Sequence, residues 1–209
     1  MISYSTISEA WFYSCREAVE NGREYRIDRG SYTGTKRRQL DYLAFIITAP
    51  QIRPLGINFS GEQISSDAEI ERYFNDYLIN PSVCENETYT YSSRLAPNLE
   101  HVALMLREAP NTNQATIEIG RPEDCFLDDP PCLRLVSWKA IGRRLQLSCF
   151  FRSWDLYGGL PTNLGGLQLL NETMAEWADL KPGPLVAYSD GGHVYDYAWP
   201  RVSLSGCCG

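Results

Sequence analysis

The sequence predicts an α+β domain in which packed helices cover a mixed β-sheet. Apolar residues recur at helical spacing in some segments, while other segments are rich in β-branched and aromatic residues. Helix-like and strand-like segments are interleaved along the chain, and several strands follow one another as hairpins. The 209 residues are 44% hydrophobic and 22% charged, with no internal repeat or long linker. These values predict one globular domain over residues 1–209.

The first half of the chain is mainly helical. Thr6 and Glu9 predict a capping box at the start of a helix, and Asn21-Gly22 predicts its end. Ser66 predicts a similar start for a second helix. We expect a helix over 6–22, a largely buried strand over 39–50, a helix from 66 to just before Pro81, and a helix over 97–108 with Pro97 in its first turn.

The second half contains most of the strands. Short turns that contain glycine separate its apolar, β-branched runs. A long apolar stripe, which includes Leu164 and Leu167, predicts a helix. We expect a strand over 114–119, two strands within 132–154 joined at Ile141-Gly142, a helix over 163–180, and two short strands within 183–199 that flank Gly191-Gly192.

Charge and cysteine usage exclude several classes of protein. The net charge of −7 and a pI near 4.9 argue against a nucleic-acid polymer as partner. No signal segment and no apolar run near 18 residues is present, so we expect no membrane partner. The seven cysteines show no CxxC pair and no metal-ligand spacing. They predict a reduced, cytoplasmic protein without a bound metal.

One basic segment, residues 25–38, stands out in this acidic chain. It carries five cations around two glycines, and such a loop can hold a small anion such as a phosphate. A solvated surface loop is the alternative interpretation. The cations are Arg26, Arg29, Lys36, Arg37 and Arg38.

Cys132 follows two prolines in the stretch DDPPCLRL, residues 128–135. Prolines fix φ and remove backbone donors, so Cys132 is predicted to lie at a stiff junction between a loop and a strand. Such a junction can aim a nucleophilic thiol, although many cysteines of this kind are only buried.

Two further segments place polar side chains next to predicted strands and helices. The stretch FRSWDLYGGLPTN, residues 151–163, places Arg152, Ser153, Asp155 and Asn163 between a strand and a helix. The stretch DGGHVYDY places His193 and Tyr195 on one face of a short strand. A structural histidine with satisfied hydrogen bonds is the alternative for His193, and a helix cap is the alternative for Asn163.

The chain resembles the thymidylate synthase family in these three segments. The PPC turn, the FRSxDxxxGxPxN motif and the HxY motif occur in the same order and at matching separations over most of residues 110–199. The sequence of these segments is most similar to the compact archaeal-type branch of the family. The resemblance implies a thymidylate synthase-like α+β fold, a small nucleotide substrate, and a homodimer built by stacked sheets.

The resemblance also implies a reaction. It is the C5 methylation of dUMP to dTMP, with 5,10-methylenetetrahydrofolate or a related methylene-pterin as cosubstrate. Addition of the Cys132 thiolate to C6 would activate C5. The amide oxygen of Asn163 can accept from uracil N3–H while its N–H donates to O4, and an aspartate there would suit cytosine better.

The resemblance assigns the remaining roles residue by residue. Arg152 would lower the pKa of Cys132. Tyr91 would organise a water near C5, and Asp155 would fix the ring or the loop. The assignments are Cys132, Tyr91 and Asp155 as catalytic residues; Arg29, Arg152 and Ser153 for the phosphate; Asp155 and Asn163 for the base; His193 and Tyr195 for the ribose 3′-hydroxyl; and Asp155 with Gly159 for the cosubstrate.

The chain departs from the common family pattern in four places. Asn113 and Gln114 lie where the partner subunit usually supplies two arginines, and Leu133 replaces a histidine. The acid that assists proton transfer has no certain counterpart, although Gln39 or Asp41 lies near its place. The tail beyond Trp199 ends SGCCG, without the apolar residues that close over folate.

Two alternative functions remain, one from the same superfamily and one suggested by these departures. The first is a hydroxymethylase acting on a uridine or cytidine monophosphate, in which water instead of hydride ends the reaction. The second is a nucleotide-binding homologue with weak catalysis.

Overall fold

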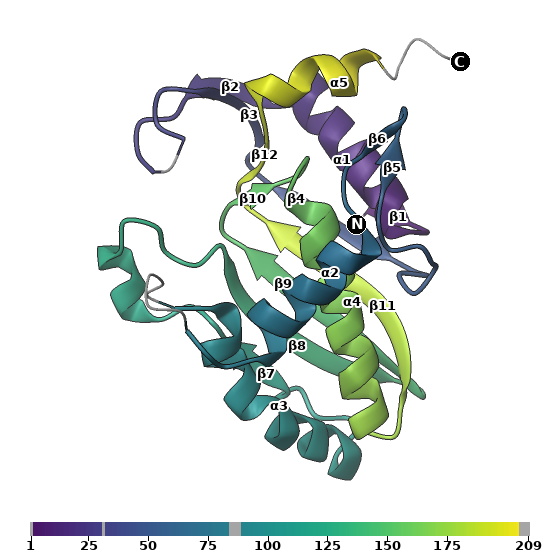
Figure 1. The fold of residues 1–209 in the computed structure, drawn as a ribbon. Helices are drawn as coiled ribbons and strands as arrows, with labels where there is room; N and C mark the ends of the chain where they lie inside the picture. The colour runs from purple at the N-terminus through teal and green to yellow at the C-terminus, as the bar shows by residue number, and fades with distance from the viewer. Residues whose placement is uncertain (1, 31, 84–88, 205–209) are drawn as a thin grey trace.

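The core of the protein is a six-stranded mixed sheet, seen in the computed structural model, which describes residues 2–30, 32–83 and 89–204 (Figure 1). β1 pairs with β4, and β11 with β9, in parallel; the other pairs are antiparallel. The strands, in spatial order, are β1 (Ile2–Tyr4), β4 (Leu43–Ile47), β11 (Lys181–Ser189), β9 (Arg144–Phe151), β8 (Leu133–Ile141) and β7 (Thr116–Glu118). The predicted α+β class with a mixed sheet is confirmed.

Helices pack on one face of this sheet. α4 crosses β9 and β11, with α2 and α3 beside it (Figure 1). The helices are α1 (Ile7–Asn21), α2 (Asp67–Tyr73), a π-helix η1 (Phe74–Ile79), α3 (Tyr91–Glu108), α4 (Leu160–Trp177) and α5 (Trp199–Leu204), with short 3-10 turns η2 (Pro122–Phe126) and η3 (Asp196–Ala198).

The two faces of the large sheet differ in burial. Across one face, aligned residues of neighbouring strands are fully buried beneath the helices, for example Ala187, Cys149 and Val136. Across the other face the aligned row includes Phe150 and Tyr188, which stay partly exposed. Because side chains alternate along a strand, this pattern leaves that face largely uncovered, although Val186 on it is buried.

A second, four-stranded sheet lies beside the large one. Its strand order is β10 (Trp154–Asp155), β12 (Gly192–Tyr195), β3 (Lys36–Leu40) and β2 (Arg23–Arg26), and a small hairpin of β5 (Asn58–Phe59) and β6 (Glu62–Gln63) completes the strands. In this sheet Asp155 is aligned with His193, and His193 with Gln39. Residues from three distant parts of the sequence therefore meet here.

Several predicted helix and strand boundaries are confirmed. The Thr6 hydroxyl accepts from Glu9 N–H at 3.1 Å, although the Glu9 carboxylate turns to Ser5 N–H and does not close the box on Thr6. Ser66 and Glu69 form the complete capping box of α2. The β8–β9 hairpin turns at Gly142, whose φ of 60° is in the left-handed region that glycine tolerates.

Three predicted boundaries are wrong. Residues 39–50 form no single strand, because the chain leaves β3 at Leu40 and enters a different sheet with β4. α3 begins at Tyr91 and not at Pro97, since the Thr90 hydroxyl caps it by accepting from Ser93 N–H at 3.1 Å. Pro97 consequently lies inside the helix.

The third wrong boundary concerns α4, which begins at Leu160 instead of residue 163. Gly159 is its N-cap residue, and Asn163 N–H already donates to the Gly159 carbonyl at 3.0 Å. Asn163 therefore lies within the first turn, and the alternative that it caps the helix is wrong.

The described part of the chain contains neither a disulfide nor a membrane-spanning helix. Cys15, Cys125, Cys132 and Cys149 are free thiols. No helix within the described ranges is both long and apolar enough to cross a bilayer. The SGCCG tail, for which the sequence predicts no closure over folate, lies outside the described residues.

Candidate active site

Cys132 and Arg152 lie at the open end of the β8–β9 hairpin. Cys132 immediately precedes β8, Arg152 immediately follows β9, and Arg152 N–H donates to the Cys132 carbonyl at 2.9 Å. The Arg152 guanidinium donates to the carbonyls of Pro130 and, at 3.1 Å from Nε, Pro131. Its Nη2 lies 3.8 Å from the Cys132 sulfur. The prolines therefore present carbonyls that hold the arginine beside the thiol.

Burial controls the protonation of Cys132. It raises the pKa of the thiol, and the positive charge of Arg152 opposes this shift without cancelling it. Asp129 raises the pKa further, and Arg37 lowers it. Arg152 thus lowers the pKa of Cys132, as predicted, but desolvation is the larger effect and the net pKa is raised.

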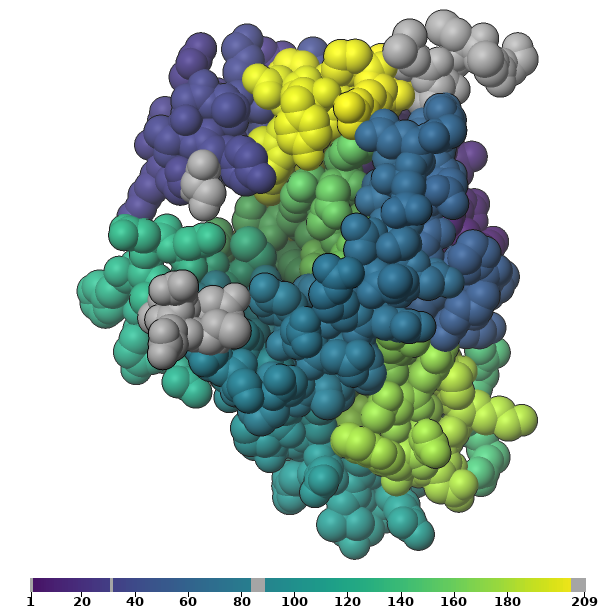
Figure 2. Space-filling model, in the orientation of Figure 1, coloured from purple at the N-terminus to yellow at the C-terminus, as the bar shows by residue number. Residues whose placement is uncertain are grey.

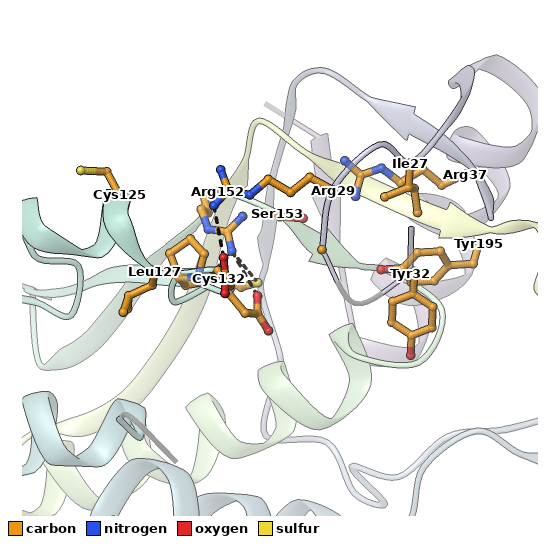
Figure 3. Close-up of a pocket in the computed structure, with 14 residues that line it drawn as sticks. Ile27, Arg29, Tyr32, Arg37, Cys125, Leu127, Cys132, Arg152, Ser153 and Tyr195 are labelled. Atoms are coloured by element: carbon orange, nitrogen blue, oxygen red, sulfur yellow. Dashed lines mark hydrogen bonds and ion pairs between the residues drawn. The ribbon is translucent and has the colours of Figure 1, made fainter. Parts of the chain in front are cut away.

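A pocket of about 450 Å³ opens in front of Cys132 (Figure 3). The surface is hollowed there between the segment around β2 and β3 and the segment before β8 (Figure 2). Three arginines, from the β2–β3 region and from β9, converge on it. The lining residues include five predicted site residues, which are Arg29, Cys132, Arg152, Ser153 and Tyr195, together with Ile27, Gly30, Tyr32, Arg37, Cys125, Leu127, Asp128, Asp129 and Pro130.

The basic segment supplies one wall of this pocket. Arg37 is held in place because its Nε donates to the Tyr25 hydroxyl at 2.6 Å. Arg29 is largely exposed, with Nη2 3.6 Å from the Asp128 carboxylate across the pocket mouth. The Tyr32 ring packs against Tyr195 at 4.4 Å between centroids. Sequence reasoning placed Arg37 in the basic segment but gave it no role in the site. Nothing in the sequence marked Tyr32 as a pocket residue.

A second cavity of about 300 Å³ is lined by four tyrosines with Thr90 and Asn163. Tyr91 connects the two cavities, since Leu133 N–H donates to its hydroxyl at 3.4 Å, directly after Cys132. Burial raises the pKa of Tyr91. The Oδ1 atom of Asn163 accepts from the indole N–H of Trp154 at 3.0 Å. Tyr91 and Asn163 therefore lie beside the thiol pocket without lining it.

Asp155 and Gly159 shape the turn that enters α4. The Asp155 carboxylate accepts from the N–H groups of Tyr157 and Gly158 at 3.0 and 3.2 Å. Burial nevertheless raises its pKa. A Cβ at Gly159 would come within 2.9 Å of the Asp155 carbonyl, so only glycine fits. Neither residue lines the pocket of Cys132.

His193 is a buried histidine with one nitrogen unused. Nδ1 lies 2.8 Å from the Gly191 carbonyl, while Nε2 has no hydrogen-bond partner among the described residues. Burial lowers its pKa to about 4, so the ring is neutral at pH 7. Nδ1 must then carry the proton to meet the carbonyl, which leaves Nε2 as an acceptor. The Tyr195 ring packs on it edge-on at 4.8 Å.

The candidate acids from the sequence do not reach either cavity. Asp41 is exposed and bound by Arg23 at 2.9 Å, and Gln39 bonds Tyr25 and Asp41. The acids that line the thiol pocket are Asp128 and Asp129 instead. Leu133, at the histidine position, is fully buried in the core.

The other departures contribute no pocket residue. Asn113 and Gln114 are exposed before β7 and line none of the cavities described here. Over the described ranges, no group of three or more histidine, cysteine or acidic side chains is placed to hold a metal ion.

The chain is similar to a family model and to several proteins that carry the name thymidylate synthase. The family model described as Thymidylate synthase matches residues 76–204. A protein of Methanosarcina mazei named putative thymidylate synthase is 28% identical over 209 residues, which cover 97% of this chain and 92% of the relative. A protein of Methanopyrus kandleri with the same name is 32% identical over 143 residues, 65% of this chain and 68% of the relative. A thymidylate synthase of Fusobacterium nucleatum is 26% identical over 152 residues, 72% of this chain and 52% of the relative.

Proposed function

The chain belongs to the thymidylate synthase family, and from this premise we propose that residues 1–209 form one domain that converts dUMP to dTMP through a covalent bond between Cys132 and C6 of the pyrimidine. The main support for this proposal is the junction that holds Arg152 beside the Cys132 thiol in an arginine-lined pocket. That arrangement joins a nucleophile to an anion-binding surface in one cavity.

The phosphate is bound by the basic wall in this proposal. Arg152, Arg37 and Arg29 face the same cavity as the Ser153 side chain, and a phosphate dianion needs such charge-assisted donors (Figure 3). Arg29 is the exposed member of the set, and water weakens its ion pair with Asp128. In this proposal the unpartnered but buried Nε2 of His193 accepts from the ribose 3′-hydroxyl, next to Tyr195, which lines the pocket.

The thiol then does the chemistry that the ring needs. C5 of uracil is a weak nucleophile until a thiolate adds to C6, which moves an electron pair toward O4 and makes C5 enolate-like. The N–H of Asn163 donates to O4 and stabilises that charge. Because the resting pKa of Cys132 is raised, loss of its proton is part of the reaction, and the nearby Arg152 charge favours the thiolate.

We assign the cosubstrate to the tyrosine-lined cavity. Flat aromatic side chains, Tyr73, Tyr77 and Tyr89, surround an open space next to Asn163 and Tyr91, which suits a planar heterocycle. A methylene-tetrahydrofolate or related pterin bound there supplies the one-carbon unit and the hydride. Tyr91 orients water near C5 from the same cavity, and Gly159, in the turn with Asp155, lies beside Asn163.

We further propose a homodimer and a cytoplasmic setting. The face of the large sheet that carries Phe150 and Tyr188 lacks a packed layer, as stacking of two sheets requires. The thiol must be reduced to react, and the described cysteines are free, which suits the cytoplasm.

The test is incubation with dUMP tritiated at C5 and methylene-tetrahydrofolate. We expect release of tritium together with dihydrofolate, and loss of both in Cys132→Ala and Cys132→Ser, with dUMP binding retained because the thiol bonds only after the ring is seated. Tritium release without dihydrofolate would identify a hydroxymethylase. Turnover that persists in Cys132→Ala would overturn the covalent mechanism.

A further inference from the structure

The orientation of the Asn163 amide is fixed from below by Trp154. The indole Nε1 lies 3.0 Å from Oδ1 of Asn163. Trp154 itself cannot shift easily, because it is buried and its ring stacks on Phe151 at 4.3 Å between centroids with an interplanar angle of 4°. An indole N–H only donates, so the atom that it meets must be the amide oxygen and not the amide nitrogen.

The Tyr73 phenol occupies the other side of the same amide. Its ring lies over Gly166, one turn along α4 from Asn163, where a Cβ would come within 2.5 Å of the ring. The Tyr73 hydroxyl is buried, and no atom of the described chain meets the geometry of a hydrogen bond with it. Asn163 nevertheless lies close enough to lower the pKa of this phenol, against the larger upward effect of burial.

A phenol oxygen can donate or accept, so Tyr73 adapts to the amide and does not decide its orientation. With Trp154 on one lone pair of Oδ1, and Tyr73 available to one N–H of Nδ2, one acceptor and one donor of Asn163 remain. That remaining pair matches uracil, which offers N3–H and O4. An amide turned by half a revolution would present the reverse pattern and match cytosine, which offers N3 and N4–H.

We propose that Trp154 is a specificity-determining residue: its indole N–H prevents the Asn163 amide from turning over, so the site accepts uracil and rejects cytosine. The inference rests on the proposed function, since it requires a pyrimidine nucleotide beside Asn163. Trp154 acts through Asn163 and has no contact with the base, so it is a positioning residue.

The test compares dissociation constants for dUMP and dCMP by titration calorimetry. The wild-type protein should prefer dUMP. In Trp154→Phe, which keeps a stacking ring and removes the N–H, the preference should fall by roughly tenfold or more, the scale of one buried hydrogen bond and a misplaced donor. Trp138→Phe is the matched control, because Trp138 is equally buried and its Nε1 has no partner among the described residues.

Two further variants separate orientation from packing. Replacing Trp154 by its benzothienyl analogue keeps the ring volume and removes only the N–H, so it should relax the preference even if Trp154→Phe folds poorly. In an Asn163→Asp background the side chain has two equivalent oxygens, and Trp154→Phe should then leave the dUMP to dCMP ratio unchanged.

The possible results are distinct. An unchanged preference in Trp154→Phe and in the benzothienyl variant overturns the inference alone. Equal relaxation in Trp138→Phe also overturns it, because packing would then be responsible. A wild-type protein that binds neither nucleotide overturns the proposed function, and this inference with it.

Discussion

Arg152 has two tasks at the scale of single residues. Its guanidinium bonds the carbonyls of Pro130 and Pro131, and the same group lies 3.8 Å from the Cys132 sulfur. The turn is therefore fixed by the group that also favours the thiolate. The pKa of Cys132 is still raised by burial, which keeps the resting thiol neutral and less open to oxidation.

His193 predicts a pH dependence of stability. Its folded pKa is about 4, below the unfolded value of about 6.5, so the unfolded state binds more protons between these two values. The free energy of unfolding should then fall as the pH falls through this window, by about 3 kcal/mol in total. Urea titrations at pH 7, 5.5 and 4 measure it.

A variant and its control isolate this contribution. His193→Asn keeps a donor for the Gly191 carbonyl but cannot titrate, so its stability should vary less over the same window. His101→Asn, at the exposed histidine of α3, should behave like the wild type. Identical pH profiles for wild type and His193→Asn would contradict the buried, neutral state of His193.

At the scale of elements, α3 is tied to the segment that leads to Cys132. Arg94 on α3 donates to both carboxylate oxygens of Asp124 in η2, at 2.7 and 2.8 Å, and to the Ile119 carbonyl at 2.8 Å. The two side chains are only 9% and 3% exposed. Because Tyr91 begins the same helix and bonds Leu133, this pair sets the helix against the thiol junction.

Removing this pair should cost much more than removing a surface pair. Arg94→Met leaves the Asp124 carboxylate buried with the weaker 3.3 Å pair to Arg134 and the Arg121 N–H at 2.8 Å, and should lower the free energy of unfolding by about 3 kcal/mol or more. Arg16→Met breaks the exposed Arg16–Glu20 pair of α1 and should cost less than about 1 kcal/mol. Equal losses in urea unfolding would refute the structural importance of Arg94.

At the scale of the whole molecule, the sheet is packed on one face only. Ser148 lies at the centre of the other face, aligned with Val186 on β11 and Ser137 on β8. If two copies stack through this face, light scattering at micromolar concentration should give twice the mass of the chain. Ser148→Arg should shift the protein toward monomer, because it places a charge in the interface.

Asn98→Arg, on the exposed side of α3, is the matched control and should stay dimeric. A wild-type protein of single mass would refute the stacked dimer. Such a result would leave the covalent chemistry of Cys132 untouched, since Cys132 and Arg152 lie at the end of the same hairpin.

The fold class, most of the elements and several residues around Cys132 could be predicted from the sequence. Local signals were sufficient there, because capping residues, hydrophobic periodicity and proline geometry act over a few neighbours. The PPC turn leads into β8 and the FRSWD stretch leaves β9, so their meeting follows from one hairpin. Pro97 and Asn163 are residues typical of helix starts, so the sequence predicts starts close to them. The helices begin earlier, at Tyr91 and Leu160, because Thr90 and Gly159 are the N-cap residues.

Which distant residues complete the site, and how they are oriented, depends on contacts between segments far apart in the sequence. Arg37 and Tyr32 reach the pocket because β3 pairs with β12, a contact between segments more than 150 residues apart in the sequence. The net pKa of Cys132 depends on burial, which no local pattern reports. The orientation of Asn163 likewise depends on the position of Trp154 beneath it, because hydrogen-bond direction is set by neighbours in space.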